Sequence, residues 1–160
     1  MAQTKVDFDA DFGTKYGIHK GVHVREETGE VYAPVSLWAD SLNLVLDRLA
    51  QVMPVPLSHI SAVSGSGQQH GSVFWNNNAG RVLANLQPKE LLAPQLAETL
   101  ANEVSPNWQD HSTQDECDAF DGRLGDREKL AQATGSGAHH VSQYPVEKLC
   151  AQSDLHNSSK

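Results

Sequence analysis

The chain has little cysteine, few aromatic residues and no long apolar run. Its 160 residues include 2 cysteines, and aromatic residues make up 6%. Cys117 and Cys150 form neither a zinc-binding spacing nor a disulfide framework. No segment approaches the roughly 20 apolar residues that span a membrane, and residues 1–15 lack the apolar core of a signal peptide. We therefore expect a soluble chain that stays in the cytoplasm and does not bind membranes.

The chain is also poor in positive charge. It carries 12 Lys and Arg residues against 20 Asp and Glu residues, which gives a formal net charge of −8. A nucleic-acid groove needs clustered cations to displace counterions from the phosphates, so we expect no nucleic-acid partner. Charged residues make up 20% of the chain, too few for a disordered polyelectrolyte. The length suits one globular domain or part of a larger one.

The N-terminal third predicts a strand, a long connection and a helix. Residues 6–9 alternate between apolar and acidic side chains like a short strand, and residues 12–33 contain the glycines of an irregular connection. A helix is predicted from Pro34 until Pro54 stops it. Its apolar residues follow the spacing of a buried stripe, formed by Trp38, Leu42, Val45, Leu46, Leu49 and Met53.

The middle of the chain predicts two strands and a short helical segment. Residues 59–64 and 72–75 are β-leaning runs separated by a glycine-rich turn. This order of helix, strand, turn and strand indicates an α/β core. Residues 88–93 predict a turn or two of helix, which Pro94 interrupts.

Two further helices are predicted by their caps. Thr113 and Glu116 match a capping box for a helix that runs to about Leu124. Asp126 can cap another helix, which ends where Gly135 can adopt the left-handed conformation.

The usual signatures of metal, nucleotide and hydrolase sites are missing. His19 and His23 lie four residues apart, but Gly17 and Gly21 disfavour a helix there, so we interpret both as solvated or turn histidines. The sequence contains no GxxxxGK[ST] phosphate loop and no GxSxG nucleophile elbow. We therefore expect no metal site and no nucleophilic serine in this chain.

One polar segment stands out, residues 64–71 (SGSGQQHG). Gln68, Gln69 and His70 follow a predicted strand at the position where open α/β sheets bind ligands. Two amides and an imidazole offer both donors and acceptors, which suits a polyhydroxylated molecule. A polar hairpin tip without a ligand explains the same residues equally well, so the residues alone leave both interpretations open.

The longer run GSGQQHGSVFW, residues 65–75, strongly resembles the xylulokinase branch of the FGGY carbohydrate kinases. Four more segments resemble the same family in the same order. They are FGTKYGIHKGVHV, APVSLWADSLNLVLDRL, SPNWQDHSTQDEC and LAQATGS, at residues 12–24, 33–49, 105–117 and 130–136. The resemblance covers residues 6–136, and the order of its motifs makes it specific.

The resemblance implies an α/β fold, namely a partial actin-like, ribonuclease-H-like N-terminal kinase domain that lacks its first strands. Residues 1–136 would form this domain, and residues 137–160 a divergent, weakly structured tail. The implied reaction of the family is the conversion of D-xylulose to D-xylulose 5-phosphate, with ATP and Mg²⁺. By the same resemblance, His70 and Gln69 contact the sugar and Asp110 helps to form the wall of the sugar site.

The resemblance also implies what this chain does not supply. The family's first phosphate-binding strand, its catalytic Asp and its adenosine site match nothing in these residues. We therefore expect no catalytic residue, no bound ATP or Mg²⁺ and no activity of the chain alone. Val141 stands where the family has a sugar-contacting Arg. The alternative is a non-catalytic remnant that binds a pentulose or self-associates, because the predicted strand at residues 59–64 would have a bare edge.

Overall fold

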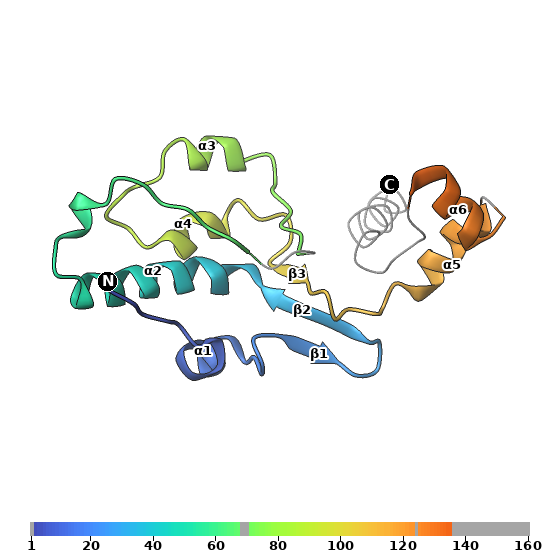
Figure 1. Cartoon of the computed structure of the whole chain (residues 1–160), viewed down its shortest axis with the longest axis horizontal. Helices are drawn as coiled ribbons and strands as arrows, with labels where there is room; N and C mark the ends of the chain where they lie inside the picture. Colours follow the sequence, from blue (N-terminus) through green and yellow to red (C-terminus); the bar gives the residue numbers. More distant parts are fainter. Residues whose placement is uncertain (1, 68–70, 124, 136–160) are drawn as a thin grey trace, which may run out of the picture. The chain divides into compact units, whose positions relative to one another are not determined.

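The computed structural model describes residues 2–67, 71–123 and 125–135. These residues combine short helices with a small sheet, which confirms the α/β class (Figure 1). The predicted tail at residues 137–160 lies outside them, so the predicted domain boundary stays a prediction. The described residues fall into two compact units. The first unit lies within Met1–His23, Ala33–Gln68 and Val73–Ser105, and the second within Val24–Tyr32, Gln69–Ser72 and Pro106–Lys160.

The first unit begins with helix α1, Phe8–Tyr16, so the strand predicted at residues 6–9 is wrong. Asp7 caps the helix, because its side chain accepts a hydrogen bond from the Ala10 N–H at 3.0 Å. Two acidic residues in the first turn favour the same end of the helix dipole. Gly17 ends the helix at φ +64°. A good N-cap thus outweighs two repeats of alternating polarity.

The end of α1 and, almost entirely, two strands of a three-stranded sheet lie within the irregular connection predicted at residues 12–33. The strands of this sheet are β1, His23–Arg25, β2, Glu30–Pro34, and β3, Val104–Pro106, in the order β1-β2-β3. Gly29 makes the turn between β1 and β2 possible, because its φ of +72° is a left-handed conformation that glycine adopts without strain. The prediction failed here because strands of three to five residues show almost no periodicity.

Helix α2, Val35–Val52, confirms the predicted helix. Pro34 is the N-cap rather than the first helical residue, and the helix stops just before the Met53–Pro54 step, where proline disfavours helical backbone. Helices α1 and α4 both contact α2, and Figure 1 shows α2 running beside α4. In the described ranges, neither α2 nor any other helix is long and apolar enough to cross a membrane.

The buried stripe predicted for α2 is only partly right. Trp38, Leu42 and Leu46 are 37%, 48% and 41% exposed, whereas Leu37 is fully buried. Asp40 is buried as well. The helix therefore packs against the rest of its unit with the face that carries Leu37 and Asp40, and much of the apolar stripe remains accessible to solvent.

The two strands predicted around the glycine-rich segment are absent from the described residues. The 3₁₀ helix η1, Leu57–His59, overlaps the first, and residues 60–67 form no regular structure. In the second, Trp75 forms only an isolated bridge with Leu100. A strand needs a paired neighbour along its length, and the pairing of the second run does not extend beyond this one bridge in the described residues.

Two short helices complete the first unit. They are α3, Ala79–Leu83, which the sequence did not predict, and α4, Leu92–Ala97. The segment predicted at residues 88–93 starts later than expected. Pro94 lies in the first turn of α4 instead of interrupting a helix, because a proline there loses no intrahelical hydrogen bond.

The second unit contains α5, Gln114–Arg123, and α6, Arg127–Thr134, which confirm the two predicted C-terminal helices. The Asp126 carboxylate accepts from the Lys129 N–H at 2.8 Å, and Gly135 ends α6 at φ +85°. A small apolar cluster of Cys117 and Leu130 joins the two helices.

Candidate functional site

One of the three predicted sugar-site residues lies among the described residues. Asp110 lies in the second unit, in the turn between β3 and α5. The other two, Gln69 and His70, lie outside the described residues, as does Val141. Whether the structure brings the three predicted residues together thus stays a prediction, and the geometry of the site is built from Asp110 outward.

Backbone hydrogen bonds hold the turn before Asp110. The Asn107 N–H donates to the Val31 carbonyl at 2.9 Å, and the Asp110 N–H donates to the Asn107 carbonyl at 2.9 Å. The Asn107 side-chain oxygen accepts from the Gln109 N–H at 3.0 Å. The Asn side chain favours such turns because its oxygen can bond the backbone two residues ahead. These bonds fix where the Asp110 backbone lies within the second unit.

The Asp110 side chain is 3% exposed, yet only one of its two oxygens is hydrogen-bonded. Oδ1 accepts from the Ser112 N–H at 2.8 Å. Oδ2 is buried and has no hydrogen-bond partner within the described ranges, and the same holds for Ser112 Oγ. Native proteins leave few such groups, and each one points to a missing partner such as water or a ligand. The exposed ring of Trp108 lies two residues before Asp110.

This arrangement is suited to neutral polar ligands. A carboxylate oxygen accepts hydrogen bonds, and a serine hydroxyl both donates and accepts. In the parts of the chain that the structure describes, no group of three or more His, Cys, Asp or Glu side chains could hold a metal ion. His19 lies in an exposed turn, where its Nδ1 is 3.6 Å from Asp9 Oδ2.

The first unit contains a polar cluster that the sequence analysis missed. The nearly buried Asp40 Oδ2 accepts a hydrogen bond from the Tyr16 hydroxyl at 2.6 Å and pairs with Lys15 Nζ. Burial and the neighbouring carboxylate raise the pKa of Tyr16. The three side chains satisfy one another, which is typical of a structural cluster. An aspartate within the apolar pattern of α2 was the available signal.

An open cavity of about 390 Å³ lies beside this cluster, still within the first unit. Its lining mixes cationic, anionic and apolar groups without one dominant chemistry. The lining residues are Lys15, Tyr16, His23, Pro34, Ser36, Ala97, Leu100, Glu103 and Val104.

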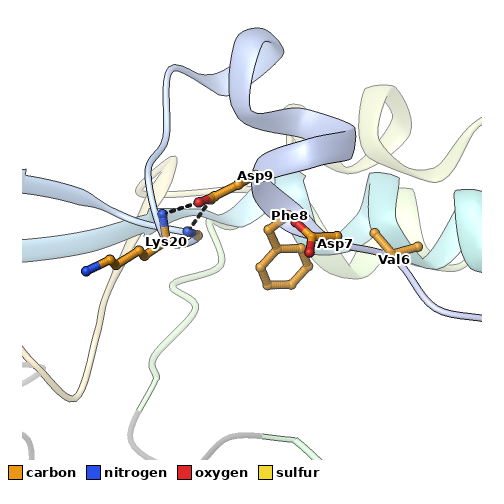
Figure 2. A pocket seen from close by; sticks show the side chains of 6 residues that line it. Val6, Asp7, Phe8, Asp9 and Lys20 are labelled. Atoms are coloured by element: carbon orange, nitrogen blue, oxygen red, sulfur yellow. Dashed lines mark hydrogen bonds between the residues drawn. The ribbon is translucent and has the colours of Figure 1, made fainter.

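A second hollow in the first unit, of about 350 Å³, is lined by residues 6–9 together with Lys20 and Gly21 (Figure 2). The Asp9 carboxylate accepts from the Lys20 N–H at 2.6 Å and from the Gly21 N–H at 2.8 Å. These bonds lower the pKa of Asp9. Because Lys20 has φ +54° and Gly21 φ +77°, the carboxylate holds a left-handed turn in place. Both oxygens of Asp9 are thus engaged in holding the backbone.

The comparisons with known proteins agree with the sequence motifs. No family model matches the chain. It is 51% identical over 137 residues to "Probable D-xylulose kinase A" of Aspergillus terreus, a match that covers 86% of this chain and 24% of the relative. Proteins of the same name from Arthroderma otae and Aspergillus clavatus are 46% and 49% identical, over 88% and 86% of this chain. The chain spans about a quarter of the length of these relatives.

Proposed function

Because the chain is homologous to one part of the D-xylulose kinases, we propose that it serves in the transfer of a phosphoryl group from ATP to D-xylulose. The product is D-xylulose 5-phosphate. The observation that carries this proposal is the identity of about half of the residues over 86% of the chain. Within such a kinase, this chain contributes part of the sugar site.

The fold proposed with this function is the N-terminal part of an actin-like kinase domain. It takes in residues 1–136, followed by a divergent tail at residues 137–160, and it works in the cytoplasm. The mixed helices and small sheet of the described residues support the α/β part of this proposal.

The sugar contacts proposed for this chain are His70, Gln69 and Asp110. The support for Asp110 is its burial together with an oxygen that lacks a partner among the described residues. A carboxylate oxygen held in this way can accept a hydrogen bond from a sugar hydroxyl without first releasing a protein partner. Val141, in place of an arginine, weakens the binding of the sugar.

The phosphoryl-transfer machinery proposed for the kinase lies in the remaining three quarters of its length. Transfer requires groups that bind ATP and Mg²⁺, neutralise the phosphates and orient the attacking hydroxyl. We assign none of these roles to the residues of this chain. The chain alone therefore binds D-xylulose weakly and transfers no phosphate.

Titration of the isotope-labelled chain with D-xylulose tests this function. We expect D-xylulose to change the amide chemical shifts of residues 67–71 and 108–113, and we expect His70→Ala to abolish these changes. We also expect no release of ADP when the chain is given ATP, Mg²⁺ and D-xylulose. An absence of shifts at these residues would overturn the sugar-binding role. ADP release from the chain alone would overturn the assignment of catalysis to the rest of the kinase.

A second candidate function is association with another chain through exposed apolar side chains, rather than through the sheet edge predicted at residues 59–64, because that strand is absent from the described residues. Val63 is 90% exposed and Ile60 is 40% exposed in the segment that forms no regular structure. Accessible apolar groups of this kind mark interaction surfaces when they gather in patches. Sedimentation velocity tests this function: we expect a dimer that Val63→Lys weakens. A monomer at every concentration would exclude self-association.

A further inference from the structure

We infer that Ser112 is a further sugar contact, and that Ser112 Oγ and Asp110 Oδ2 together bind neighbouring oxygen atoms of a polyol. This inference rests on the proposed function and deepens it, because it adds a residue and states the ligand chemistry that the pair recognises. It begins with two buried atoms of the same turn that lack hydrogen-bond partners in the described part of the chain.

The two atoms belong to one local structure. The Ser112 N–H donates to Asp110 Oδ1 at 2.8 Å, so the backbone of one residue orients the carboxylate of the other. This bond occupies Oδ1 and leaves Oδ2 as the oxygen available to a ligand. Among the described residues, the remaining buried atom of this kind is Asn43 Nδ2, which belongs to α2 in the first unit and has no such companion.

The chemistry of the pair favours a hydroxylated ligand. An anionic ligand is disfavoured because the Asp110 carboxylate would repel it. A metal ion is disfavoured because the described residues contain no group of three or more His, Cys, Asp or Glu side chains that could hold one. A ligand hydroxyl can donate to Asp110 Oδ2, while an adjacent oxygen exchanges a hydrogen bond with Ser112 Oγ. Two neighbouring carbons of a polyol carry this combination. A single buried water could instead bond both atoms, and the effect of Ser112→Ala on D-xylulose affinity distinguishes a water from a polyol.

The backbone of the turn is already held in place by hydrogen bonds within it. The Asn107 carbonyl and side-chain oxygens already bond the N–H groups of Asp110 and Gln109. Binding therefore requires little ordering of the backbone, which favours affinity. Trp108, 50% exposed and in the same turn, offers an aromatic ring to the apolar C–H groups of a sugar.

Ser112→Ala tests the inference, because it deletes the hydroxyl and keeps the N–H that orients Asp110. We expect the Kd for D-xylulose, measured by calorimetry, to rise about fivefold to tenfold, as for the loss of one hydrogen bond. The melting temperature without sugar should stay constant or rise, since an unsatisfied buried hydroxyl disappears. Ser58→Ala, at an exposed serine of the first unit, is the matched control and should change neither quantity.

Asp110→Asn is the second variant. The Asn oxygen must accept from the Ser112 N–H, which places the NH₂ group where Oδ2 was. An acceptor thus becomes a donor, and we expect D-xylulose affinity to fall at least tenfold. Equal affinity in this variant would mean that Asp110 Oδ2 accepts nothing from the ligand.

A panel of D-xylulose, D-ribulose, xylitol and glycerol separates the failure of this inference from that of the proposed function. Binding of D-xylulose that Ser112→Ala leaves unchanged overturns the inference and keeps the function; a structural water is then the partner of Ser112. Binding of another polyol alone, lost in Ser112→Ala, keeps the inference and overturns the function. Binding of no polyol by the unsubstituted chain overturns both.

Discussion

Aspartate carboxylates in the two units of the molecule differ in how their oxygens are hydrogen-bonded. In the first unit, Asp9 bonds two backbone N–H groups and Asp11 bonds both terminal nitrogens of Arg48, each through both of its oxygens. Asp40 bonds Tyr16 and Lys15 through Oδ2. In the second unit, Asp110 is buried with one oxygen bonded and the other without a partner in the described ranges.

We propose that this contrast separates structural carboxylates from a binding carboxylate. A carboxylate that other groups of the protein already bond lowers the free energy of the folded chain. A buried oxygen without a partner costs free energy until a partner arrives. The first unit should therefore respond to substitution through stability, and the Asp110 turn through sugar affinity.

The largest expected effect on stability comes from the apolar packing of the first unit. Leu37→Ala removes a fully buried side chain, and we expect it to lower the free energy of unfolding by about 3 kcal/mol, as for cavities in other cores. Leu42→Ala, on the same helix but 48% exposed, should cost less than about 1 kcal/mol. Urea denaturation measures both. Equal losses would mean that the accessible stripe of α2 is packed after all.

The next effect comes from the Asp40 cluster. Asp40→Ala leaves the Tyr16 hydroxyl without its acceptor, and we expect a loss of about 2 kcal/mol, the usual cost of a charged hydrogen bond. Asp40→Asn should lose less, because its carbonyl oxygen still accepts from Tyr16. Asp47→Ala, at an exposed position of the same helix, is the control. A loss no larger than that of the control would contradict a structural role for Asp40.

A smaller effect is expected from the Asp11–Arg48 pair, and it depends on pH. The hydrogen bonds from Arg48 lower the pKa of Asp11 to about 2, from an ordinary value of 3.8. Because the folded-state pKa is the lower one, the pair stabilises the folded chain above pH 3.8. That contribution is lost as the pH falls from 3.8 towards 2.

Arg48→Gln should therefore flatten the fall in the urea midpoint over this acid range. Arg81→Gln, which removes an equal charge from an exposed position in α3, should leave the acid dependence close to that of the unsubstituted chain. The same acid dependence in all three proteins would show that the Asp11 pair contributes nothing to folding.

Helices α2 and α6 could be predicted from the sequence because residues at their ends signal where they begin and stop. Asp126 and Gly135 define both ends of α6, and α2 begins and ends at prolines. The strands β1, β2 and β3 could not be predicted, because they are very short and because β2 pairs on one side with β3, which is distant in the sequence.

The candidate site could be predicted only in part. Asp110 was identified by a family resemblance; the structure shows that it is buried, and its role as a sugar contact stays a prediction. Ser112 was missed because an unsatisfied hydroxyl is a property of three-dimensional packing and leaves no sequence pattern. Asp40 was missed because its partners, Lys15 and Tyr16, are more than twenty residues away in the chain.

The most direct measurement of the central claim is a D-xylulose titration of the isotope-labelled chain and of its Asp110→Asn variant. If the Asp110 turn binds the sugar, the amides of residues 108–113 shift with a saturable dependence on D-xylulose, and the variant needs at least tenfold more sugar. If these amides do not move, or if the variant titrates like the unsubstituted chain, the turn is not part of a sugar site.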